Sequence, residues 1–401
     1  MTKVRVLFFF LSLFIITILG TIAILYATGF RFNRETGQVS AHGLLNVTSD
    51  PNGAQIIVNG ELKSATNSTV TLTPNEYQLV IKKDGYLTWK KTIRIEKEIV
   101  TAVDASLFQS APSLSAITFT GIVNPQLSPD LGKIVYAVES DDPLTQGLWV
   151  METSNLPILF NRQPHRITDG SMKDFEWYWS PDSRQILMTN KPLEKNATTK
   201  QKQTYKELST ILQVSEYIKS TDRIVSLSSR EIILSQWNDI KNQQIEAQLS
   251  RLPKELAQIF QEKTQIIAFS PDETKILYSA TGSATITEGV IKPLPGSSTQ
   301  QQKRSIEKGK VYVFDIKEDR NFEITTDDSV VYWLPNSTNL MIPQKDKISI
   351  VDYDGTNLQS VYSGSYVYPT AYPSPSTGRL FVLTNLGATG APVNLYSLNL
   401  K

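Results

Sequence analysis

The pattern of hydrophobic and polar positions divides the chain into three parts. The first is a single apolar run within residues 1–30. The second, residues 43–108, alternates short runs of β-branched and aromatic residues with turn signals, which is typical of short strands in a small β-sandwich. The third, residues 112–401, repeats this strand-and-turn pattern over a longer stretch. The pattern therefore predicts a mainly β protein with one N-terminal helix.

The N-terminal run predicts a membrane anchor. Val6 to Tyr26 carries no charge, and as a helix it is long enough to cross a hydrocarbon core of roughly 30 Å. A cleavable signal peptide has a shorter apolar region and a small-x-small cleavage site, and the following "YATGFRF" offers no good site of this kind. We expect an uncleaved, single-pass signal anchor that places the later domains outside the cytoplasm.

Turn signals define the strands of the second part. Asp50-Pro51-Asn52-Gly53, Asn59-Gly60 and Asp84-Gly85 separate its apolar runs, and Asn-Gly and Asp-Gly tolerate the positive φ angles of tight hairpins. Pro51 and Gly53 are therefore interpreted as structural turn residues.

This part resembles the PEGA domain, which is named after a Pro-Glu-Gly-Ala turn. Residues 51–54 read Pro-Asn-Gly-Ala here, so Asn replaces Glu. The resemblance continues through "IIVNG" at 56–60 and "LTPNEYQLVIKKDGY" at 72–86. It implies a surface β module without catalytic residues, acting as a spacer or as a contact to the cell wall.

A short motif recurs through the third part, in "LSPDLGKIVYAV" from Leu127, "WSPDSRQILMTN" from Trp179 and "FSPDETKILYSA" from Phe269. Two weaker copies follow, "WLPNSTNLMIP" and "PSPSTGRLFVL". A catalytic site would not appear five times in equivalent positions, whereas a turn would, because Pro presets φ and Asp, Asn or Ser accepts bonds from the amides beyond it. The predicted structural turn residues of the first four copies are Asp130, Asp182, Asp272 and Asn336.

One strand pair per repeat is the mark of a β-propeller, and the Ser-Pro-Asp-x-x-x-Ile unit resembles the TolB-type, or WD-like, propeller repeat. Residues 106–121 either form a sixth blade or close the ring by pairing with the C-terminal strand "VNLYSLNL". We therefore expect five or six blades.

The repeats are spaced more widely than the roughly 40 residues that a blade needs, and the excess falls at about 195–263 and 288–309. Residues 235–263 read as two helices broken at Pro253, with a partial apolar stripe. Residues 288–309 read as a flexible Pro/Ser/Gln-rich loop. Together these insertions are the predicted partner surface, although a helical cap packed on the blades is an equal alternative for the helices. The candidate interaction residues are Trp237, Leu249, Leu256 and Phe260.

Composition removes several classes of chemistry. The absence of Cys excludes disulfides, thiolate metal sites and a Cys nucleophile. Only two His occur and the net charge is +1, which disfavours a multi-His metal centre and bulk attraction to nucleic acid. No P-loop, H-E-x-x-H or G-x-S-x-G motif is present. We therefore expect no enzyme activity, no catalytic residues, no cofactor and no bound metal.

Three functions are compatible with this sequence. The favoured one is a membrane-anchored surface protein that binds an unidentified protein or envelope polysaccharide. The alternative is a carbohydrate-active hydrolase or lyase with carboxylates in the propeller funnel, for which Asp174, Glu176, Asp327 and Asp328 are candidates. Two carboxylates about 5–10 Å apart in a concave pocket, without charge partners, would favour the enzyme. The third is a sensor whose output lies in a partner.

Overall fold

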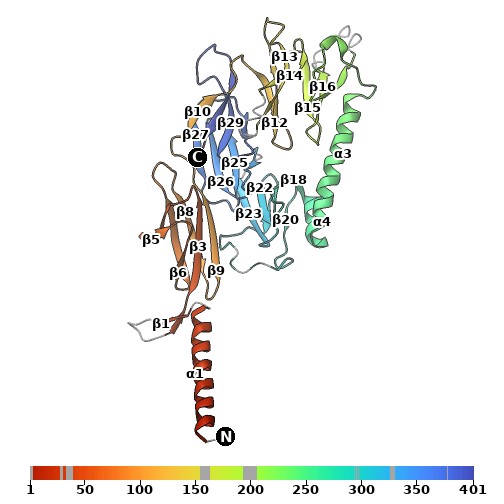
Figure 1. Ribbon diagram of the computed structural model, residues 1–401. Helices are drawn as coiled ribbons and strands as arrows, with labels where there is room; N and C mark the ends of the chain where they lie inside the picture. The colour runs from red at the N-terminus through yellow and green to blue at the C-terminus, as the bar shows by residue number, and fades with distance from the viewer. Residues whose placement is uncertain are drawn as a thin grey trace. The chain divides into compact units, whose positions relative to one another are not determined.

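The computed structural model confirms the mainly β fold (Figure 1). The chain forms two compact units. Unit 1 contains Met1–Ser110, Ile291–Gln302 and Lys317–Asp319, and unit 2 contains the remainder. The structure describes residues 3–27, 30–32, 39–153, 163–192, 206–292, 294, 296, 298–325, 330–376 and 378–401.

Unit 1 begins with helix α1, Lys3–Ala27. Leu7–Ile24 within it is long and apolar enough to cross a membrane, and in the described part of the chain α1 is the one helix of this kind. Strands β1 (Phe30–Phe32) and β2 (Val39–Ala41) then form an antiparallel pair.

Two further sheets form the β-sandwich of unit 1, with strand orders β6-β3-β9 and β5-β4-β7-β8. Their strands are β3 Gly43–Asp50, β4 Gln55–Val58, β5 Glu61–Ala65, β6 Ser68–Leu72, β7 Asn75–Lys82, β8 Trp89–Ile95 and β9 Val100–Ser106. Strands β3 and β9 run parallel, and the other pairs are antiparallel. Pro51 and Gly53 lie in the β3–β4 turn, where Gly53 has φ +72°.

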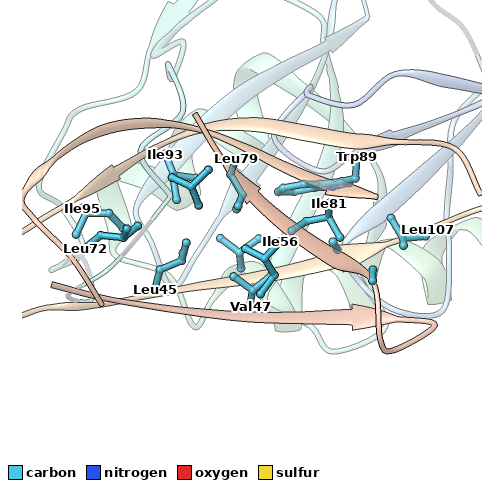
Figure 2. Packing of buried hydrophobic residues seen from close by; sticks show 14 residues of the cluster. Leu45, Val47, Ile56, Leu72, Leu79, Ile81, Trp89, Ile93, Ile95 and Leu107 are labelled. Carbon is cyan, nitrogen blue, oxygen red and sulfur yellow. The ribbon is translucent and has the colours of Figure 1, made fainter. Parts of the chain in front are cut away.

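The sandwich core is built from alternating positions of both sheets. In β3 every second residue from Leu45 is buried, and β8 buries Trp89, Ile93 and Ile95. Figure 2 shows these side chains pointing toward one another, with Trp89 beside Ile81. The period of two in the sequence therefore defines the inner face of each sheet.

Strand β8 is an edge strand whose outer side is covered by part of the segment 291–302. The Thr299 hydroxyl oxygen accepts a bond of 3.1 Å from the backbone amide of Arg94. The side-chain Nε2 of Gln300 donates to the Thr92 carbonyl at 2.5 Å. Covering an edge prevents pairing with foreign strands. Residues 299 and 300 of the predicted loop 288–309 therefore bind the sandwich. The role of this loop in partner binding stays a prediction.

Unit 2 contains, in its described residues, five sheets of three or four antiparallel strands and one two-stranded pair, β20 (Ala284–Thr285) with β21 (Ser305–Ile306). Sheet I comprises β11 Val123–Leu127, β12 Lys133–Val138, β13 Gly147–Glu152 and β14 His165–Asp169. Sheet II comprises β15 Phe175–Trp179, β16 Gln185–Asn190 and β17 Ser209–Gln213. Sheet III comprises β18 Thr264–Phe269, β19 Lys275–Ala280, β22 Val311–Asp315 and β23 Arg320–Thr325.

Sheet IV comprises β24 Tyr332–Trp333, β25 Asn339–Gln344, β26 Lys347–Asp352 and β27 Gln359–Ser363. Sheet V has the order β10-β30-β29-β28, with β10 Ser113–Ala116, β28 Ala371–Pro373, β29 Arg379–Thr384 and β30 Asn394–Asn399. Strand β10 therefore enters sheet V beside the C-terminal strand, with Ser113 opposite Asn399. Of the two alternatives for residues 106–121, the structure shows the closing strand.

Neighbouring sheets pack face to face. Residues of sheets I and II share one buried cluster, those of III and IV share another, and a third joins sheet V to sheet I. In the third, Phe381 and Leu395 of sheet V pack with Ile134 and Tyr136 of sheet I. Because the last sheet of the chain packs on the first, the chain returns to its starting sheet, as in a β-propeller.

The predicted helical insertion comprises α3, Arg230–Leu249, and α4, Lys254–Lys263, after a short 3₁₀ turn at Ser220–Asp222. The range assigned to this insertion, 195–263, was too wide because it contains β17, the third strand of sheet II. The polar composition before residue 209 concealed a short strand, Ser-Thr-Ile-Leu-Gln, that extends the sheet.

Candidate functional site

Each repeat motif forms the turn between the first two strands of one sheet, and we call these five turns the marker turns. In the first three, the Ser hydroxyl donates to the Asp carboxylate at 2.5, 2.6 and 2.6 Å. That carboxylate accepts the amide two residues later, and the Ser oxygen accepts the amide five residues later. In the fourth, Asn336 accepts the amides of Thr338 and Asn339, each at 3.2 Å. The motif is a local hydrogen-bonded unit, which explains its repetition.

The Asp272 carboxylate shows the electrostatic consequence of this arrangement. Burial by itself raises the pKa of Asp272, but the bonds from Ser270 and Thr274 outweigh burial and lower it to about 2. The pKa values of Asp130 and Asp182 are lowered as well.

We expect Asp272→Ala to reduce the free energy of unfolding by about 1 kcal/mol at pH 7, as for the loss of a capping bond. The folded pKa lies below the unfolded value of 3.8, so the carboxylate stabilises the fold above about pH 4 and loses this effect as the pH falls toward 2. Denaturant unfolding at pH 7 and near pH 2 measures both values. Asp239→Ala, at an exposed carboxylate on α3, is the control. If Asp272→Ala lowered the free energy of unfolding as much near pH 2 as at pH 7, the stabilising role of the Asp272 carboxylate would be contradicted.

Hydrogen bonds also link the first strands of neighbouring sheets. The Trp179 indole donates to the Gln126 carbonyl at 3.1 Å, joining sheet II to sheet I. The Tyr372 hydroxyl donates to the Pro125 carbonyl at 2.6 Å, joining sheet V to sheet I. Trp179 and Tyr372 therefore tie sheets II and V to the first strand of sheet I.

The first strands of four sheets and the marker turns of sheets I and III line a cavity of about 860 Å³, here called the axial cavity. Residues from sheets I, III, IV and V line it, and most of them are apolar. The lining residues are Gln126–Leu131, Ile267–Phe269, Pro271, Val330–Trp333 and Tyr372.

A second hollow of about 1070 Å³, here called the α3 groove, lies between helix α3 and the marker turns of sheets I, II and III. Figure 1 shows α3 as a long helix beside sheet II and β18. The helix contributes Leu234, Trp237, Lys241 and Ile245, and the facing wall includes Trp179, Phe269 and three marker-turn prolines. The groove shares residues 126, 127, 129, 267–269 and 271 with the axial cavity, so the two hollows adjoin.

Of the four predicted interaction residues, only Trp237 lies in this groove, where it is half-buried. Leu249, Leu256 and Phe260 are buried, with exposed fractions of 2, 1 and 1%. The Phe260 ring packs edge-on against Tyr278 at 5.1 Å and Phe314 at 5.5 Å in sheet III. The prediction for these three is therefore corrected: their apolar stripe binds the propeller itself, as in the helical-cap alternative.

The candidate carboxylates of the enzyme hypothesis are not gathered in either hollow. Glu176 accepts the Tyr178 hydroxyl at 2.8 Å and lies 3.9 Å from Arg230. Partial burial and this carboxylate raise the pKa of Tyr178. Asp174 is absent from the lining of both hollows, and Asp327 and Asp328 lie outside the described residues.

The two carboxylates that do line the hollows, Asp130 and Glu273, each have a cation nearby. Lys133 lies 3.8 Å from Asp130, and Arg251 lies 3.1 Å from Glu273. The unpartnered pair that would favour a glycosidase or lyase is thus not found among the described lining residues. Across the described part of the chain, no group of three or more acidic or His side chains is placed to hold a metal ion.

Comparison with known proteins identifies the first domain. Residues 42–111 match the model of the PEGA domain. No curated protein sequence matches the chain.

Solved structures with some likeness include β-propellers of different activities. TolB from Acinetobacter baumannii is 10% identical, with 90% of this chain and 63% of that chain covered and a TM-score of 0.24. The β-propeller domain of the Trilobed protease from Pyrococcus furiosus is 14% identical, with coverage of 89% and 83% and a TM-score of 0.19. Oligogalacturonate lyase from Vibrio parahaemolyticus is 8% identical, with coverage of 92% and 96% and a TM-score of 0.27.

Likenesses at this level transfer no activity, so the architecture rests on the sheets, their closure and the matched domain. The chain therefore combines a segment that matches the PEGA domain with a C-terminal β-propeller of the kind that the repeat motif predicted.

Proposed function

We propose that this protein is a single-pass, membrane-anchored binding protein without catalytic activity, whose propeller holds a segment of a partner polypeptide in the α3 groove. The observation that carries the proposal is the groove itself. It follows α3 from Leu234 to Gln248, which is roughly 20 Å of helix at about 1.5 Å per residue, so its length suits a stretch of polymer.

The lining favours polypeptide as the polymer. Ten of its 22 lining residues are aliphatic or prolyl, Leu234, Ile245 and Ile266 among them, and four are aromatic. Such a surface can bury the apolar side chains of a partner. Trp237 supplies an aromatic anchor of the type that dominates binding energy at protein interfaces. The exposed Lys241 lies on the rim, and no carboxylate partner for it is found among the described residues. The partner segment would thus carry apolar anchors and a nearby acidic residue.

The anchor helix and the PEGA-like segment support an extracytoplasmic placement of the binding domain. Helix α1 is long and apolar enough to span a membrane, and a long domain that follows a single N-terminal anchor is commonly exported. The PEGA-like segment would act as the spacer. The cation partners of Asp130 and Glu273 support binding rather than carboxylate catalysis in the two hollows.

The test places a photo-crosslinking amino acid at Asn238, which lines the groove, and at Gln243, an exposed α3 position outside it. In intact cells, we expect a discrete protein adduct from position 238 and none from position 243. An adduct to wall polysaccharide would show the glycan alternative instead, and equal labelling at both positions would contradict the proposal.

With that partner purified, Trp237→Ala should raise the Kd at least tenfold, because truncating a central aromatic anchor costs about 2 kcal/mol or more. The free energy of unfolding should fall by less than the roughly 3–5 kcal/mol lost on truncating a fully buried Trp, since Trp237 is only half-buried. Trp237→Phe should retain most of the affinity. Isothermal titration calorimetry and denaturant unfolding measure the two quantities, and unchanged affinity in Trp237→Ala would place the interface elsewhere.

A further inference from the structure

Sheet II differs from the other four large sheets of unit 2 in its number of strands. In the described residues, sheets I, III, IV and V each have four strands, whereas sheet II ends at its third strand, β17. Its outer edge is therefore the position that a fourth strand occupies elsewhere in the same ring.

The register between β16 and β17 shows which backbone groups this edge presents. The backbone amide of Asn190 donates to the Leu208 carbonyl at 3.2 Å, and the backbone amide of Val214 donates to the Arg184 carbonyl at 3.0 Å. Hydrogen-bonded pairs alternate along an antiparallel ladder, so Leu208, Thr210, Leu212 and Val214 bond to β16. Ser209, Ile211 and Gln213 must therefore direct their amides and carbonyls away from the sheet.

Two of the outward groups are already used. The Ser209 carbonyl accepts the Ser226 amide at 2.6 Å, and the Gln213 carbonyl accepts the Glu216 amide at 3.3 Å. Four outward groups have no backbone partner among the described residues. They are the amide and carbonyl of Ile211 and the amides of Ser209 and Gln213. The edge thus offers three donors and one acceptor in an extended array.

Apolar side chains lie exposed next to this array. Ile211 itself is exposed, and Ile224 and Leu227, which flank Ser226, are among the most exposed large hydrophobic residues. An added strand with apolar residues at alternate positions would cover Ile211 while its backbone pairs with β17.

Sheet V shows that this ring accepts a fourth strand from a remote part of a chain. Its outer strand β10 precedes all the propeller repeats, yet it pairs with β30 over four residues. A backbone array of this kind selects an extended polypeptide, because a lipid or a glycan has no matching run of amides and carbonyls.

We propose that the free edge of β17 is a strand-addition site, at which an extended segment of a partner polypeptide becomes the fourth strand of sheet II. The segment carries apolar residues at alternate positions and no proline at the positions that face β17. This site is separate from the α3 groove and does not depend on the function proposed for that groove.

The test uses a phage-displayed library of random twelve-residue peptides, selected on the full-length detergent-solubilised protein and counter-selected on the Ile211→Pro variant. Proline at 211 removes an outward amide but no bond to β16, and edge strands tolerate proline at such positions. Selected peptides should alternate apolar and polar residues, and their Kd should rise at least tenfold on Ile211→Pro. The matched Ile211→Val and the groove variant Trp237→Ala should bind within about twofold of the wild type.

A second measurement varies only the peptide and uses the wild-type protein, so the test stays valid if Ile211→Pro unfolds. Single backbone N-methylation along a selected peptide should weaken binding at least tenfold at alternate residues and by less than threefold between them, because only every second amide faces β17. Uniform sensitivity to methylation, the absence of discriminating peptides, or dimerisation of the wild type that Ile211→Pro abolishes would overturn the proposal. The last outcome would assign this edge to a second copy of the chain.

Discussion

Removal of residues 394–401 is expected to prevent the propeller from folding. Strand β30 lies between β29 and β10, so its loss breaks two ladders of sheet V at once. It also removes three fully buried side chains, Leu395, Leu398 and Leu400. Each buried leucine is worth about 2–5 kcal/mol, and the three together match the 5–15 kcal/mol that holds a typical domain.

The single change Leu398→Ala provides a graded version of this experiment. It should lower the free energy of unfolding of the propeller by about 2–5 kcal/mol, whereas Leu144→Ala, at an exposed leucine of the same unit, should change it by less than about 0.5 kcal/mol. Circular dichroism with denaturant titration measures both variants. A truncated chain that retains the cooperative transition of the propeller would show that β30 does not close the ring.

Trp89→Ala is expected to unfold the PEGA-like sandwich. The Trp89 side chain is 2% exposed and lies in the core, beside Ile81 (Figure 2). Truncating a buried Trp lowers the free energy of unfolding by about 3–5 kcal/mol. A module of this size has a small free energy of unfolding to begin with, because small domains bury a smaller share of their surface.

Hydrogen exchange resolved to β7 and β8 measures this effect. Protection of both strands should be lost in Trp89→Ala and kept in Leu62→Ala, which truncates an exposed residue of the same sandwich. Amides of sheets III and IV should keep their protection in both variants, because the propeller has its own cores. Persistence of β7 and β8 protection in Trp89→Ala would contradict the central role of this side chain.

Local features of this chain could be predicted from its sequence because their hydrogen bonds close within a few residues. The bonds of the marker turn at Asp272 join Ser270 to Lys275 and Asp272 to Thr274, so the motif itself contains the donors and acceptors that define it. The same holds for Gly53, whose positive φ follows from the turn in which it lies. The period-two burial of β3 and the length of α1 are likewise properties of the pattern alone.

The candidate site depended on contacts that the pattern does not contain. An apolar stripe on a helix is the same whether it faces a partner or its own domain, and only the packing of Phe260 on Tyr278 and Phe314 shows that it faces its own domain. Trp237 belongs to the same predicted stripe but lines the groove, and the buried residues of α3, Ile233 and Leu249, lie near the two ends of the helix.

The sequence by itself determined most of the strands, the repeated turns and the N-terminal apolar helix, since each of these depends on neighbours along the chain. Only the tertiary structure decided that β10 pairs with β30, that Thr299 and Gln300 cover the edge of β8, and that β17 has no fourth strand among the described residues. The physical reason is that backbone amides and carbonyls are the same in every residue. How distant segments meet in space therefore decides which strand edges are paired and which remain unpaired.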